Sequence, residues 1–112
     1  MSQFKDLKAR QEGMLKRAKA TPAPRFTVYA LADPRTGKVC YVGITTYLKH
    51  RIEAHRSQAK RSPKGLLYVW LGALLGEGLL PIVMVLALTD DVSQESAHIN
   101  RLLAAGHPIA QR

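Results

Sequence analysis

The chain has 112 residues, of which 46% are hydrophobic and 22% are charged. This profile excludes a disordered tail and leaves room for one compact core rather than two. The net charge of +9, from 17 Lys and Arg against 8 Asp and Glu, indicates a polyanionic partner, either nucleic acid or an anionic membrane surface. The single cysteine, Cys40, excludes an internal disulfide and favours a reducing, cytoplasmic location with a buried, unreactive thiol.

The first segment, residues 2–20, alternates charged and apolar positions and predicts a basic amphipathic helix. Pro22 and Pro24 end it, because proline removes a backbone donor. We therefore divide the chain into a basic N-terminal helix and linker, residues 1–25, and a folded domain, residues 26–112. The helix is expected to grip backbone phosphates, and an interfacial membrane helix is the alternative for it. No apolar run typical of a secretory signal is visible.

Two strands and a turn follow. Phe26–Ala32 and Val39–Ile44 are rich in β-branched, aromatic and aliphatic residues, and residues 33–37 contain the proline and glycine typical of a turn. This pattern predicts a β-hairpin. A loop confined to residues 33–37 sets Tyr29 directly opposite Tyr41 on one face of the sheet. Taken alone, such a pair is also what an ordinary hairpin places across its strands.

A pair of helices is predicted after the hairpin. The first begins at an N-cap, Thr45 or Thr46, and runs to about Lys60. A Ser-Pro-Lys-Gly segment then breaks the chain, and a mostly apolar helix extends to about Leu75. Two aromatic side chains of this second helix are expected to pack in the core: Tyr68 and Trp70.

Leu66–Leu88 is long and apolar, but Glu77 and Pro81 interrupt it, so a membrane-spanning helix is not expected. Pro81–Leu88 is a continuous apolar run, which predicts a strand covered by helices on both faces. Three residues with cap chemistry then introduce a last helix to about Ala105: Asp90, Asp91 and Ser93. The whole pattern predicts an α+β domain with three strands sandwiched by helices.

Short motifs on these elements resemble those that name the GIY-YIG nucleases. Thr27-Val28-Tyr29 and, one strand later, Tyr41-Val42-Gly43 are similar to the paired tripeptides of that family. Arg51 with His55 resembles the Arg of the family's first helix and the His or Tyr four residues on, and Glu95 matches the Glu of the final helix. Their order and spacing together are much more specific than any one motif.

The resemblance covers residues 26–109 and departs from the family at two positions. Thr27 stands where Gly is typical, and the Asn expected after the last helix is missing, with Gln111 nearby. The resemblance implies a three-stranded antiparallel sheet flanked by helices, to which the N-terminal helix is an addition. It also implies metal-dependent hydrolysis of phosphodiester bonds in DNA. A nucleic-acid-binding module on the same scaffold, without turnover, is the alternative that the missing Asn favours.

The resemblance implies a role for each motif residue. Glu95 would hold one Mg²⁺ or Mn²⁺ ion, since Mg²⁺ commonly takes one carboxylate plus waters. Tyr29 would accept the proton of the attacking water, as a phenolate favoured by Arg51 and the metal, and His55 would relay that proton. Arg51 would also neutralise charge in the transition state. The remaining motif positions are Tyr41, which would bond the water or phosphate, and Val28, Val42 and Gly43, which shape the hairpin.

Basic side chains are concentrated in residues 46–64, where Glu53 is the one acidic residue, and this favours a surface for phosphate backbones. We expect DNA to cross the active face and to contact five of them: Lys49, Arg56, Lys60, Arg61 and Lys64. Sequence specificity is expected to be low, with branched or damaged DNA among the substrates and a second copy or a partner protein supplying specificity. A membrane is not expected as a partner.

Overall fold

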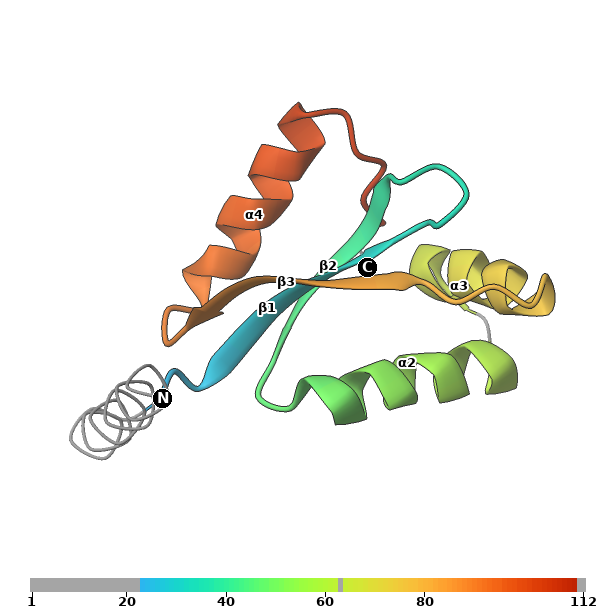
Figure 1. Ribbon diagram of the computed structural model, residues 1–112, viewed down its shortest axis with the longest axis horizontal. Coiled ribbons are helices and arrows are strands. Elements are labelled where there is room, and N and C mark those ends of the chain that lie inside the picture. Colours follow the sequence, from blue (N-terminus) through green and yellow to red (C-terminus); the bar gives the residue numbers. More distant parts are fainter. Residues whose placement is uncertain (1–22, 63, 111–112) are drawn as a thin grey trace, which may run out of the picture.

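The computed structural model describes residues 23–62 and 64–110. Within them, three strands form one antiparallel sheet in the order β2-β1-β3, and three helices pack around it (Figure 1). The elements are β1 Phe26–Ala32, β2 Val39–Thr45, α2 Leu48–Arg61, α3 Leu66–Gly76, β3 Ile82–Thr89 and α4 Ser93–Ala104. The α+β class and these six elements are confirmed, with ends that differ by a few residues. The helix predicted over residues 2–20 lies outside the described residues.

The helices lie on two sides of the sheet (Figure 1). On one side, Ile99 and Leu102 of α4 pack against a cluster of strand residues that includes Val28 and Val42. On the other side, α2 and α3 pack on each other around a second apolar cluster: Ala59, Leu71 and Leu74. Alternate residues of β1 therefore face two different helical layers, as the period of a strand requires.

The register of the hairpin differs from the predicted one. Tyr29 pairs with Gly43 and Leu31 pairs with Tyr41, so the direct pairing of the two tyrosines is wrong. The turn extends through residue 38, and Cys40 is an extra residue in β2, because Ala32 already pairs with Val39. This β-bulge shifts the register a second time and returns Tyr41 to the face of Tyr29. The tyrosines are thus diagonal neighbours on one face.

The strand β3 is not covered on both faces, contrary to the expectation from its apolar sequence. It lies at an edge of the sheet, beside β1. Val83 and Val85 pair with Leu31 and Tyr29 and so share their face, yet they are 39% and 56% exposed. The helices α2 and α3 cover the β1–β2 half of this face and leave β3 open. No helix among residues 23–62 and 64–110 is both long enough and apolar enough to cross a membrane.

The hairpin turn is anchored to α3 by a buried carboxylate. Asp33 accepts hydrogen bonds from Arg35 Nη2 at 2.7 Å and from Trp70 Nε1 at 3.0 Å. The hydrogen bonds from Arg35 and then Trp70 hold the pKa of Asp33 well below its usual range. Gly37 closes the turn with φ 73°, a conformation that favours glycine, and its N–H donates to the Asp33 carbonyl at 2.8 Å. The hydrogen bond between Asp33 and Trp70 fixes the hairpin against α3, one of the helices that border the cavity described below.

The start of α2 also differs from the prediction. The N-cap is Tyr47 rather than a threonine, and it makes no side-chain cap hydrogen bond. Thr45 Oγ1 instead accepts the N–H of Tyr47 at 3.2 Å, which turns the chain from β2 into the helix. One tight corner therefore joins β2, which carries Tyr41, directly to α2, which carries Arg51.

Candidate active site

A cavity of about 440 Å³ lies between the sheet and its helices. Its walls come from β1, β2, α2, the loop before α3, the first turn of α3 and the first turn of α4. It brings together all five residues to which the family resemblance gives a catalytic role: Tyr29, Tyr41, Arg51, His55 and Glu95. At roughly 30 Å³ per water, this volume has room for a phosphate group, a hydrated ion and several waters.

Tyr29 is fixed by the glycine opposite it. A Cβ atom on Gly43 would lie 2.6 Å from Tyr29 Oη and 2.7 Å from Cζ, distances that real Cβ contacts do not show. The ring of Tyr29 therefore fills the space that a side chain at position 43 would need. Tyr29 is 1% exposed although it lines the cavity, so its contact with the cavity is narrow. The absence of a side chain at Gly43 therefore serves the close packing of Tyr29.

Tyr41 and His55 complete an aromatic cluster on the same face. The ring centroids of Tyr29 and Tyr41 are 6.1 Å apart, and Tyr41 meets His55 edge-on at 5.4 Å. These distances lie in the range that favours aromatic pairs. The bulge at Cys40 is what makes this cluster possible, because an unbulged strand would turn Tyr41 to the α4 side. Cys40 itself is buried, and burial raises the pKa of its thiol.

His55 connects the sheet to both helices of this layer. Tyr29 Oη and His55 Nε2 are joined by a buried hydrogen bond of 2.6 Å, and His55 Nδ1 and Tyr68 Oη by one of 3.1 Å. Burial, together with the Arg51 guanidinium, lowers the pKa of His55 to about 4. The imidazole is therefore neutral near pH 7, with one nitrogen that donates and one that accepts.

The expectation of a phenolate at Tyr29 is not met in the protein by itself. Burial raises the pKa of Tyr29 well above its ordinary value, and the neighbouring Tyr41 adds to the increase. Arg51 acts in the opposite direction but is outweighed. Tyr29 is therefore a neutral phenol at pH 7. It can accept a proton only if its own proton leaves in the same step, and His55 Nε2 is the adjacent group that can take it.

Arg51 and Lys64 give the cavity its positive charge. Both side chains line it and both residues are exposed. An exposed guanidinium and an ammonium on one wall suit the oxygens of a phosphate, which a rigid fork can bind in pairs. Arg51 is reached from His55 by one turn of α2, the spacing that puts two side chains on one side of a helix.

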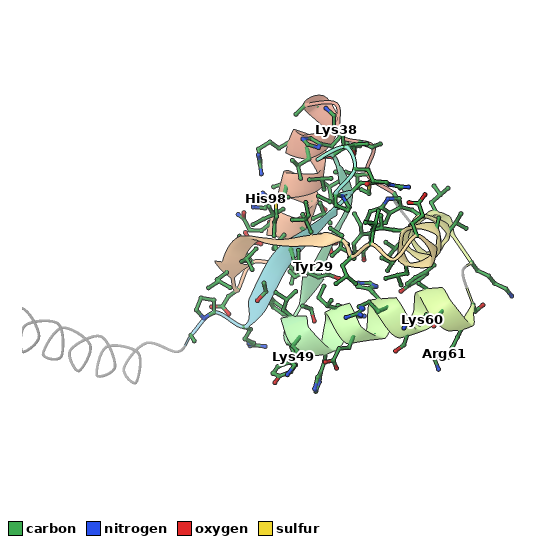
Figure 2. All side chains as sticks on the ribbon, turned by 45° about the vertical axis from the view of Figure 1, so that its right-hand side comes forward. Tyr29, Lys38, Lys49, Lys60, Arg61 and His98 are labelled. Atoms are coloured by element: carbon green, nitrogen blue, oxygen red, sulfur yellow. The ribbon has the colours of Figure 1, made fainter. Side chains whose placement is uncertain are left out.

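The other basic residues expected to contact DNA lie elsewhere on α2. At about 100° per residue, Lys49, Arg56 and Lys60 form a stripe roughly opposite the one that carries Arg51 and His55. All are exposed, as is Arg61. In Figure 2, Tyr29 lies at the centre of the molecule, whereas Lys49 and Arg61 lie at the two ends of α2. Lys64 is the member of the predicted set that reaches the cavity.

Glu95 enters the cavity from the opposite side of the sheet. It lies in the first turn of α4, whose N-cap is Val92 and makes no side-chain cap hydrogen bond. Asp91 Oδ1, one residue before the N-cap, accepts the N–H of Ser93 at 2.9 Å in the turn that leads into the helix. Residues 23–62 and 64–110 contain no group of three or more His, Cys, Asp and Glu side chains that could hold an ion. A single carboxylate in a roomy cavity still fits Mg²⁺, which keeps several waters and takes further ligands from a substrate phosphate.

Tyr68 is a member of the site that the sequence reasoning assigned to the core. It lines the cavity and is half-buried, and its hydroxyl bonds to His55. A buried histidine on the inner side of α2 needs partners for both ring nitrogens, which is the signal that points to a second hydroxyl nearby. Tyr68 and Trp70 both pack against the cluster of α2 and α3, as expected, and the indole N–H of Trp70 also binds Asp33.

The cavity thus combines groups that bind anions, a carboxylate for a hard cation and a phenol–imidazole pair that can move a proton. His98 lies on α4, on the other side of the sheet from α2 (Figure 2), and does not join them. Gln111 lies outside the described residues. A scan against protein-family models, a search of curated proteins and a search of solved structures each found no match to this chain.

Proposed function

We propose that this protein is a metal-dependent endonuclease of the GIY-YIG type, which hydrolyses phosphodiester bonds in DNA with low intrinsic sequence specificity. The observation that carries the proposal is the shared cavity. Two phenols, an imidazole, a guanidinium and a carboxylate line it from β1, β2, α2 and α4, in the order that the sequence motifs imply. Four separate elements converging on one such set is hard to explain by packing alone.

Substrate binding is the first step. Arg51 and Lys64 hold the scissile phosphate, and the Arg51 fork shields the negative charge that grows on the phosphorane-like transition state. Glu95 would hold one Mg²⁺ or Mn²⁺ ion, which would supply Lewis-acid stabilisation of the phosphate and of the departing 3′ oxygen. No step requires a second carboxylate.

Proton removal is the second step. A water opposite the 3′ oxygen gives its proton to Tyr29 Oη as the Tyr29 proton passes to His55 Nε2, over the 2.6 Å hydrogen bond. The new bond forms between the water oxygen and phosphorus, the bond from phosphorus to the 3′ oxygen breaks, and solvent protonates that oxygen. The negative charge of a bound phosphate would oppose the effects that lower the His55 pKa and so would favour this transfer. Tyr41 orients the water or the phosphate.

The arrangement of basic residues supports a substrate with two arms. Lys49, Arg56, Lys60 and Arg61 are exposed on α2, and the first three lie on the stripe that faces away from the cavity. We propose that one DNA arm lies at Arg51 and Lys64 while a second arm contacts the outer stripe. Branched DNA provides both arms. A second copy of the chain or a partner protein in the cytoplasm would add sequence specificity.

A specific observation favours one rival, a DNA-binding module without turnover. Tyr29 is 1% exposed and its pKa is raised, which hinders its contact with a water and its ionisation. In this rival the cavity binds a phosphate, and the buried phenol–imidazole pair only stabilises the fold.

Cleavage of a labelled forked duplex and a matched linear duplex, with Mg²⁺, Mn²⁺ or EDTA, tests the proposal. We expect metal-dependent cutting that is lost in Glu95→Gln and falls at least a hundredfold in Tyr29→Phe, with DNA affinity retained. Glu53→Gln, an exposed glutamate on α2, is the matched control and should cut normally. Binding without cutting in every metal buffer would overturn the nuclease and establish the binding module.

A further inference from the structure

The hydrogen bond from His55 to Tyr68 has a geometry that the proposed reaction can use. Tyr68 lies in the first turn of α3, and its ring centroid is 5.9 Å from that of His55. His55 is 4% exposed and sits between two hydroxyls, Tyr29 Oη at Nε2 and Tyr68 Oη at Nδ1. These two hydrogen bonds place one hydroxyl at each ring nitrogen, so they bear directly on where the imidazole proton resides.

The two distances indicate which atom donates in each bond. Hydrogen bonds from O–H groups to oxygen have donor–acceptor distances of about 2.5–3.0 Å, whereas those from N–H groups span about 2.7–3.2 Å. The 2.6 Å contact between Tyr29 and Nε2 matches an O–H donor, and the 3.1 Å contact between Nδ1 and Tyr68 matches an N–H donor. His55 then carries its proton on Nδ1 and accepts at Nε2. The hydroxyl proton of Tyr68 remains available for solvent, since Tyr68 is half-buried and lines the cavity.

We propose that Tyr68 is a positioning residue that holds His55 in the tautomer with the proton on Nδ1, so that Nε2 can receive the proton of Tyr29. Its hydroxyl oxygen accepts the Nδ1–H and keeps that proton away from Nε2. In the opposite tautomer Nε2–H would donate to Tyr29 Oη, and Tyr29 would have no adjacent acceptor on His55. The tautomer follows from the hydrogen bonds alone, whereas its effect on cleavage rests on the proposed function.

The proton balance during catalysis makes the role explicit. When Tyr29 passes its proton to Nε2, His55 becomes an imidazolium with protons on both nitrogens. The Tyr68 oxygen then bonds a positively charged donor, and hydrogen bonds to charged groups are stronger than those to neutral ones. Tyr68 thus stabilises the state in which the proton has moved, in addition to orienting the ring. The guanidinium of Arg51, one turn earlier on the same helix, acts against this state because it lowers the pKa of His55.

Nitrogen-15 NMR of the imidazole side chains tests the tautomer without any cleavage. In the wild-type protein at pH 7, we expect the shift of a protonated nitrogen at Nδ1 of His55 and that of an unprotonated nitrogen at Nε2. Tyr68→Phe keeps the ring and removes the acceptor, and should shift His55 toward the Nε2–H form. Tyr47→Phe, at a 56% exposed tyrosine, is the matched control and should leave His55 unchanged. A wild-type spectrum with the proton on Nε2 would overturn the proposal whether or not the variant folds.

Single-turnover cleavage adds the functional readout. Tyr68→Phe should lower the rate constant of cutting about tenfold or more while the Kd for DNA stays within about twofold, because Tyr68 acts through His55 and not on the substrate. Equal rate constants in wild type and Tyr68→Phe would refute the positioning role even though the nuclease proposal stands. Absence of cutting in the wild type would refute the nuclease, and the NMR result would still decide the tautomer.

Discussion

Gly43→Ala is the sharpest perturbation of the candidate site, because it adds a single methyl group. That methyl would lie 2.6 Å from Tyr29 Oη, 2.7 Å from Cζ and 2.9 Å from Cε1, whereas ordinary contacts begin at 3.4 Å. The ring must therefore move by about 0.8 Å, the difference between 3.4 and 2.6 Å. Tyr29 is 1% exposed and hydrogen-bonded to His55, so it has little free space to enter.

The cost of that movement follows from its parts. Overpacking of a tight core costs about 1–3 kcal/mol. A weakened buried hydrogen bond between Tyr29 and His55 adds about 1 kcal/mol. Restricting the unfolded chain returns about 0.4–1 kcal/mol, since Gly43 does not have a positive φ that alanine would resist. We expect a net loss of about 1–4 kcal/mol in the free energy of unfolding. The cleavage rate should also fall, because Tyr29 is displaced.

Urea denaturation of four variants isolates this contact. Gly76→Ala is the matched control, because no atom lies within 4 Å of a Cβ placed there and its φ is not positive. It should be neutral or slightly stabilising. In a Tyr29→Leu background the atoms that clash are gone, so Gly43→Ala should then cost much less than it does beside Tyr29. A Gly43→Ala protein as stable as Gly76→Ala, with unchanged cleavage, would refute the packing argument.

Three further predictions concern stability and binding. The free energy of unfolding should fall by about 3 kcal/mol as the pH drops from about 6.5 to about 4, because His55 gains a proton in the unfolded chain there but not in the folded protein. Urea titrations at several pH values should show this loss in His50→Gln, the control, but not in His55→Gln. Asp33→Asn should lower the Tm by several degrees, whereas Glu77→Gln, which removes the exposed partner of Arg35, should change it little. Equal Tm values in the two variants would argue that Asp33 does not anchor the hairpin turn. Arg51→Lys should reduce the single-turnover cleavage rate about ten- to hundredfold without changing the Tm, since a lysine lacks the planar fork of the guanidinium. A wild-type rate in this variant would show that Arg51 takes no part in cleavage.

Local sequence patterns were sufficient for the elements of the fold. β-branched and aromatic runs, turn residues and breakers are local signals, and they located all three strands and the three described helices. The bulge in β2 was not predicted, although the spacing of the apolar residues of that strand indicates it. Val39, Val42 and Ile44 all pack on the α4 side, so the apolar spacing changes from three to two. That change of period is a signal in the sequence, and reading it would have corrected the register of Tyr41.

Whether β3 is covered on one face or on two could not be predicted from its own residues. A continuous apolar strand is compatible with a buried centre or with an exposed edge, and the strand order decides between them. That order depends on the crossover from α3, which the local pattern does not determine. The same reasoning explains the position of the basic residues. Their number in residues 46–64 is visible in the sequence, but the cap at Tyr47 and the helical phase settle which of them reach the cavity.

The geometry of the candidate site depends on a polar contact between layers rather than on either apolar cluster. One cluster joins α4 to the sheet, and the other joins α2 to α3. A buried hydrogen bond between Tyr29 and His55 joins the sheet to α2, and a second hydrogen bond between His55 and Tyr68 joins α2 to α3. Hydrogen bonds are directional whereas apolar contact is not, so this pair of hydrogen bonds fixes one position of α2 and α3 against the sheet. Arg51 on α2 and Glu95 on α4 can face the same phosphate only if that position is kept. The residues proposed to move the proton are therefore also the ones that set the distance across the cavity.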